Sequence, residues 1–212
     1  MSDSIKTIKY KGCTIEIYQD ETGFIDGGPR DGDNLGIMAC FHKRYCLGDD
    51  IKWHGMTSQM FDGWDKMESY IRTKRHGVII FPLFLFDHSG LTISIDPTPF
   101  RQADSAGWDW GQVGFIYTTR ERIMANFTDG RKKKNLTNKM LEHAAKILRS
   151  EIETYDLYLR DAVYGYQSLD EDGETIDQCT GFYGDDGIEY AIKEGKGGID
   201  QYLENKKNGV LA

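Results

Sequence analysis

The feature that most constrains this chain is the run of residues 78–86, in which every side chain is apolar. A short, continuous apolar run is typical of a strand that is buried on both faces of a sheet. Pro82 lies inside this run and has no N–H group, so we expect a bulge or an unpaired position there. After Ser89-Gly90, residues 91–95 alternate, which predicts the next, antiparallel strand. The fold therefore contains a sheet with both faces covered.

The rest of the chain alternates between strand-like and helix-like patterns. Alternation or a short apolar run predicts strands at 5–10, 13–18, 35–41, 113–117, 162–167 and 175–183. Helical spacing predicts helices at 57–75, 119–126, 136–159 and 185–205, the last interrupted by glycines. These elements predict an α+β fold with a mainly antiparallel sheet, one long helix at about 136–160 and two or three shorter helices. The length of 212 residues fits a single domain, 1–212, with the acidic C-terminal third, 151–212, as a candidate subdomain.

Charge is distributed unevenly along the sequence. The formal net charge is −8, and residues 151–212 contain 15 acidic and 5 basic residues. This last part therefore has a net charge of −10, against +2 for the first 150 residues. Just before it, residues 120–149 hold nine bases, four of them in the run 131–134. An acidic surface keeps a protein soluble, and it also suits a basic partner or the imitation of nucleic acid.

The sequence alone does not decide whether the acidic third only keeps the protein soluble or also binds a partner. If it binds a partner, we expect the contacts from a predicted turn and from the start of the last helix, namely Asp170, Glu171, Asp172, Glu174, Asp185 and Asp186. Direct binding of nucleic acid is not expected, because the overall charge is negative.

The end of the apolar run carries the main candidate for an active site. The tetrapeptide Asp87-His88-Ser89-Gly90 follows that run, Asp109 ends a long polar loop, and Glu153 lies on the long predicted helix. If Asp87, Asp109 and Glu153 converge, they suit a divalent cation such as Mg²⁺ that activates water, with His88 as a base. The structural alternative is a turn that is fixed by Asp and Ser side chains, with glycine at a positive φ.

A second group of possible ligands is Cys40, His42, Cys46 and His54. Two residues apart on a strand share a face, so Cys40 and His42 could bind one ion together. The spacing matches no usual zinc motif, and Cys40 continues an apolar run, so we expect no metal here. The sequence has no glycine-rich phosphate loop and no dinucleotide fingerprint, so no cofactor is expected either.

Several features predict a protein of the cytoplasm. No apolar stretch approaches 18 residues, and the first ten residues have no apolar leader core. The four cysteines are too few for a disulfide scaffold, so we expect free thiols in a reducing compartment. We expect no membrane association, and the oligomeric state stays open.

Several strings resemble a family of small proteins from phages, plasmids and other mobile elements. They span roughly residues 33–184 and are Asp33-Asn34-Leu35-Gly36, His42-x-Arg44-Tyr45-x-Leu47-Gly48-Asp49, Pro82-Leu83-x-Leu85-x-Asp87-His88-Ser89-Gly90, Asp109-x-Gly111-Gln112-Val113-Gly114-Phe115-Ile116-Tyr117, Glu153-x-Tyr155-Asp156-x-Tyr158-Leu159, Val163-Tyr164-Gly165 and Gly181-Phe182-Tyr183-Gly184. The resemblance implies a setting, that of phages and other mobile elements in a host cell, and not a reaction. Small acidic proteins from that setting often block host defence, such as restriction enzymes or RNA-guided nucleases, whose nucleic-acid channels are basic.

These observations favour an accessory protein that binds a host protein through its acidic third and imitates nucleic acid electrostatically. The host protein is expected to have a basic surface, as a defence nuclease does. The first alternative is a hydrolase or nuclease that uses Asp87, His88, Asp109 and Glu153 with a divalent cation. The second alternative is a structural or oligomerising module of a phage particle.

Overall fold

The chain folds into two compact units. The structure, a computed structural model, describes residues 4–20, 28–127 and 135–209. Unit 1 combines the two ends of the chain, Met1–Gly28 and Arg160–Ala212, and unit 2 is the intervening segment Pro29–Leu159. The C-terminal part of unit 1 thus begins at residue 160, close to residue 151, where the acidic third begins. Residues 1–28, at the N-terminus, belong to the same unit.

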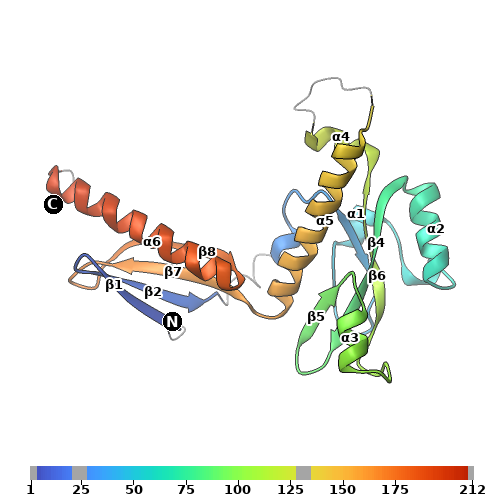
Figure 1. The fold of residues 1–212 in the computed structure, drawn as a ribbon, viewed down its shortest axis with the longest axis horizontal. Helices are drawn as coiled ribbons and strands as arrows, with labels where there is room; N and C mark the ends of the chain where they lie inside the picture. Colours follow the sequence, from blue (N-terminus) through green and yellow to red (C-terminus); the bar gives the residue numbers. More distant parts are fainter. Residues whose placement is uncertain (1–3, 21–27, 128–134, 210–212) are drawn as a thin grey trace. The chain divides into compact units, whose positions relative to one another are not determined.

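Unit 2 is built on a four-stranded antiparallel sheet with the order β3-β6-β4-β5. Its strands are β3 (Ile37–Cys40), β4 (Gly77–Asp87), β5 (Leu91–Ser94) and β6 (Trp110–Thr119). Figure 1 shows α5 (Asn138–Leu159) along one face of the sheet and α2 (Trp64–Lys74) along the other. The shorter segments are η2 (Gly28–Arg30), α1 (Ile51–His54), η3 (Ser58–Met60), α3 (Thr98–Ala103) and α4 (Arg120–Phe127).

Two apolar clusters fill the two sides of this sheet. Ile116 of β6 belongs to the cluster that contains Leu148 of α5. Its neighbours in sequence, Phe115 and Tyr117, belong to the cluster that contains Ile71 of α2. Successive side chains of a strand point to opposite faces, so β6 supplies both clusters and is buried from residue 113 to residue 118. The expected sheet with two covered faces is confirmed.

Strand β4 is central, but it is less buried than its apolar sequence predicts. Only Leu83 and Leu85 of this strand are buried. The reason is the short neighbour β5, which pairs with residues 84–87 and leaves the first half of β4 without a partner on that side. Pro82 itself pairs in register with Phe115, and the ladder between β4 and β6 shifts between Leu83 and Phe84, so the expected bulge lies one residue beyond the proline.

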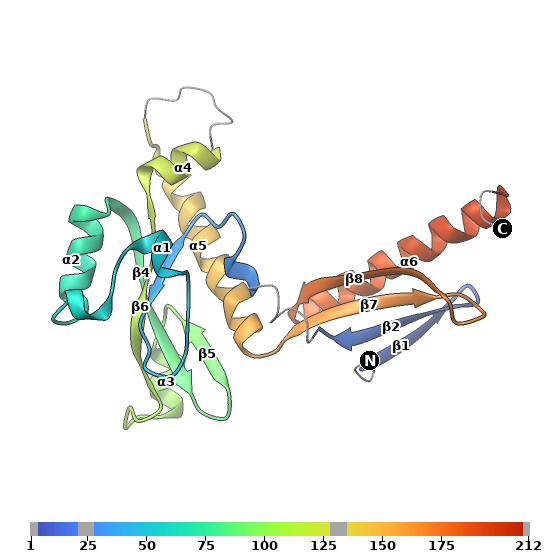
Figure 2. The ribbon, with the colours of Figure 1, turned by 180° about the vertical axis from the view of Figure 1, so that it is seen from behind.

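Unit 1 is a second antiparallel sheet with one long helix on it. The sheet has the order β1-β2-β7-β8, with β1 (Lys6–Tyr10), β2 (Cys13–Gln19), β7 (Val163–Leu169) and β8 (Thr175–Tyr183). Figures 1 and 2 show α6 (Gly184–Lys207) lying along one face. Ile15 and Ile17 of β2 and Tyr166 of β7 pack there against Ala191 and Ile199 of the helix. The predicted α+β fold is confirmed, with two antiparallel sheets.

Helix α6 is continuous over 24 residues, although its glycines predicted an interruption. Two of the glycines allow the helix to approach the sheet. A Cβ atom on Gly195 would lie 3.1 Å from the Ser168 hydroxyl, and one on Gly198 would lie 2.8 Å from Cγ of Asp177. Glycine lowers helix stability by about 1 kcal/mol relative to alanine, and close packing offsets that cost here. Gly197, by contrast, faces open space.

Candidate functional site

The structure brings three of the four candidate catalytic residues together at one end of the sheet of unit 2. Asp87 is the last residue of β4, His88 follows it, and Asp109 precedes β6. The Asp87 N–H donates to the Asp109 carbonyl at 2.7 Å, which continues the ladder between the two strands. His88 Nδ1 lies 2.8 Å from Asp109 Oδ2. Neighbouring antiparallel strands place these residues side by side.

The Asp87 carboxylate already has partners. It forms an ion pair with Arg44, and the Tyr45 hydroxyl donates to it at 3.2 Å. Both partners come from the segment after β3, so the carboxylate ties that segment to the end of β4. The carboxylate therefore has a structural role, but as a link between two segments and not as the residue that fixes its own turn.

His88 and Asp109 form an exposed pair. The side chain of His88 is 64% exposed and that of Asp109 is 40% exposed. The His88 ring stacks on Phe86 at 5.8 Å between ring centres, and the contact to Asp109 uses Nδ1, which leaves Nε2 available. A carboxylate in this position orients an imidazole and determines which ring nitrogen carries the proton in its neutral form. The pair can therefore act as a general base, in the presence of a suitable substrate.

Glu153 lies elsewhere on unit 2. It is exposed on α5, and within the described residues its side chain makes no hydrogen bond or ion pair with Asp87, His88 or Asp109. One turn further along α5, Asp156 accepts the backbone N–H of Ile93. In residues 4–20, 28–127 and 135–209, no group of three or more His, Cys, Asp or Glu side chains is placed to hold a metal ion.

The cysteine and histidine group borders a wide depression of about 950 Å³ beside α1. Burial raises the pKa of Cys40 to about 12, so its thiol stays protonated. Burial and the nearby Arg44 lower the pKa of His42, and burial lowers the pKa of His54. All four cysteines of the chain are unpaired.

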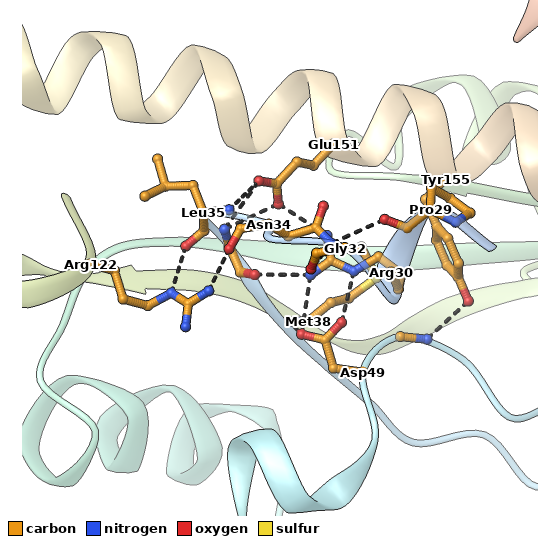
Figure 3. A network of polar contacts seen from close by, with 12 residues as sticks. Pro29, Arg30, Gly32, Asn34, Leu35, Met38, Asp49, Arg122, Glu151 and Tyr155 are labelled. Carbon is orange, nitrogen blue, oxygen red and sulfur yellow. Dashed lines mark hydrogen bonds and ion pairs between the residues drawn. The ribbon is translucent and has the colours of Figure 1, made fainter. Parts of the chain in front are cut away.

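A buried ion cluster in unit 2 was not anticipated from the sequence (Figure 3). The guanidinium of Arg30 contacts the Asp49 carboxylate twice, at 2.8 and 3.1 Å, and the Glu151 carboxylate at 3.0 Å. The three side chains are 4%, 9% and 11% exposed. Burial alone lowers the pKa of Arg30, but the hydrogen bonds and attraction of the two carboxylates outweigh burial and raise it.

The two carboxylates of this cluster also bind the backbone. Glu151 accepts the N–H groups of Leu35 and Gly36, and Asp49 accepts that of Met38. Helix α5 is thereby fixed to the segment that leads into β3. One guanidinium faces two carboxylates, and the backbone N–H groups of Leu35, Gly36 and Met38 supply the remaining hydrogen bonds, as buried ions require. We interpret it as structural.

The six candidate partner-binding acids fall into two places in unit 1. Four lie in the turn between β7 and β8, and two lie in the first turn of α6, at the other end of β8. Asp170 is a turn-forming residue, because it accepts the N–H groups of Glu174 and Asp172 and these bonds lower its pKa. Asp185 and Asp186 are exposed in the first helical turn, where negative charge is favourable.

The three remaining acids of the turn are free. Glu171, Asp172 and Glu174 are exposed, and within the described part of the chain their side chains form no ion pair. Unit 1 as a whole contains 17 acidic and 8 basic residues, whereas unit 2 contains 17 acidic and 18 basic residues. The negative charge of the protein thus belongs to unit 1.

No protein-family model, no curated protein and no solved structure matches this chain. Among the helices of the described residues, none has the length and apolar character needed to cross a membrane.

Proposed function

We propose that this chain is a binding protein without catalytic activity, and that acidic unit 1 contacts a basic surface of a partner protein. The observation that carries the proposal is the partition of charge, −9 for unit 1 against +1 for unit 2. A unit with such an excess of one sign attracts oppositely charged surfaces and speeds their encounter.

The turn acids supply the contacts in this proposal. Glu171, Asp172 and Glu174 project from a turn that Asp170 holds together, so their positions are set before a partner arrives. A preorganised set of carboxylates pairs well with Lys and Arg, and it can stand where phosphates would stand in a nucleic-acid channel. Following the resemblance described above, the partner is a host protein that handles nucleic acid, such as a defence nuclease.

A charge-reversal experiment tests the proposal. The full chain is used to capture a partner from host lysate, and the association rate of the purified pair is then measured at two salt concentrations. Replacing Glu171, Asp172 and Glu174 by lysine should slow association strongly and remove most of its salt dependence.

A matched control changes the net charge equally in unit 2, by lysine at Asp62, Asp65 and Glu142, which are exposed. This control should alter association much less. Equal association of both variants and the parent chain would contradict the proposal, and so would tight binding of the parent chain to duplex DNA.

A second candidate function is hydrolysis, with His88 as general base. It is favoured by the 2.8 Å contact between His88 and Asp109. Activated ester and phosphodiester substrates test it between pH 5 and pH 9. His88→Gln should abolish any turnover, and equal turnover by the parent chain and this variant would contradict it.

A further inference from the structure

The loop before β6 has a backbone fixed by hydrogen bonds and presents an exposed tryptophan. Trp108 is 87% exposed. The Asp104 carboxylate accepts the backbone N–H groups of residues 106–109, at distances from 2.6 to 3.2 Å. The indole N–H of Trp110 donates to the Asp104 carbonyl at 2.8 Å. Together with the bond from the Gly107 N–H to the Asp104 carbonyl at 3.3 Å, Asp104 accepts six hydrogen bonds from residues 106–110, which fix the backbone that carries the exposed ring.

A polar pocket of about 310 Å³ adjoins this ring. Its walls come from the ends of β4 and β6 and from the segment after β3, and they include Arg44, Asp87, Trp108, Asp109 and Gln112. A pocket of this volume suits a small ligand. It lies wholly in unit 2 and is independent of the acidic turn in unit 1.

The pocket offers unused donors and acceptors. Within the described residues, four polar side-chain atoms of the lining make no hydrogen bond. They are Nε and Nη1 of Arg44, Oδ1 of Asp109 and Oε1 of Gln112. A ligand that both donates and accepts matches this set. One guanidinium stands against two carboxylates, so the lining has no excess positive charge and does not favour phosphate groups.

We propose that this pocket binds a neutral saccharide. A sugar ring has an apolar C–H face that can pack on the Trp108 ring, while each hydroxyl can donate and accept. Neighbouring hydroxyls would hydrogen-bond to Arg44, Asp109 and Gln112. Nucleobases also stack on tryptophan, but nucleotide sites add positive charge for the phosphates, and this pocket lacks it.

Saturation-transfer NMR on the full chain tests the proposal. The probes are glucose, galactose, mannose, N-acetylglucosamine and their β1,4-linked disaccharides, with AMP and N-acetylarginine amide as charged comparisons. We expect transfer to the ring C–H protons of at least one neutral saccharide. Trp108→Ala should weaken that binding at least about tenfold, as loss of an aromatic anchor does.

Trp53→Ala is the matched control, because Trp53 is a second exposed tryptophan of unit 2, at 61%, and does not line the pocket. It should leave binding unchanged. Asp104→Ala should weaken binding with Trp108 still present, because the loop loses its fixed shape. Three results would each overturn the proposal: no transfer to any saccharide, full binding by Trp108→Ala, or preferential binding of AMP or the arginine derivative.

Discussion

The buried ion cluster of unit 2 predicts a large loss of stability when its cation is removed. Arg30→Met keeps most of the apolar volume but deletes the four hydrogen bonds of the guanidinium, two to Asp49, one to Glu151 and one to the Gly36 carbonyl. Two carboxylates that are 9% and 11% exposed then lose their counter-charge. Breaking a buried ion pair on one side costs about 3–5 kcal/mol. We therefore expect unit 2 to lose about that amount at pH 7.

Tryptophan fluorescence measures this loss selectively. All four tryptophans of the chain, at positions 53, 64, 108 and 110, belong to unit 2, so their signal during urea unfolding reports that unit. The control is Arg72→Met, which removes an exposed ion pair with Glu68 on the same unit. Exposed pairs contribute about 0–1 kcal/mol. Equal urea midpoints for the two variants would refute the reasoning.

Three further predictions concern other parts of the chain. Gly197→Ala should stabilise unit 1 by up to about 1 kcal/mol, because alanine favours the helix. Gly198→Ala should destabilise unit 1 by about 1–3 kcal/mol, because the added methyl group overpacks the contact with the sheet. Thermal unfolding of both variants, followed by circular dichroism, tests the two predictions. His54 has a lowered pKa in the folded state, so the unfolded state binds the proton more readily and stability should fall as pH drops below about 6.5. His54→Asn should flatten that dependence in urea titrations at several pH values. Thiol titration of the native protein should find two fast groups, Cys46 and Cys179, which are exposed, and two slow ones.

Sequence patterns predicted the parts of the fold that depend on near neighbours. The strands at 5–10 and 13–18 were predicted within a residue or two, because alternation is a local signal, and they pair as a hairpin through Lys11-Gly12. Whether Asp87, Asp109 and Glu153 converge was left open by the sequence, and the structure brings Asp87 and Asp109 together at neighbouring strand ends. Nothing in the sequence distinguished Glu153 from the two aspartates as a site residue. Helical spacing shows which residues share an exposed helix face, but not which other segment of the chain lies beside that face.

Distant contacts escaped prediction for a physical reason. Arg30 and Glu151 are 121 positions apart in the sequence. Arg30 lies in a segment rich in glycine and aspartate, and no pattern in that segment indicates that its arginine is buried. The pairing of β2 with β7, which makes unit 1 one sheet, likewise joins strands far apart in the sequence. The continuity of α6 was missed because glycine propensity opposes it, while the close approach to β7 and β8 favours it.

The insertion of unit 2 between β2 and β7 has a consequence for synthesis on the ribosome. When β2 has emerged, its hairpin with β1 has no helix and no further strand to pack on, and an isolated two-stranded hairpin is marginal in water. Unit 2 is a continuous segment and can fold next, which shortens the effective loop between β2 and β7. Strands β7 and β8 and helix α6 emerge after unit 2, so the acidic turn takes shape only after unit 2 has left the ribosome. A nascent or truncated chain therefore lacks the proposed binding surface.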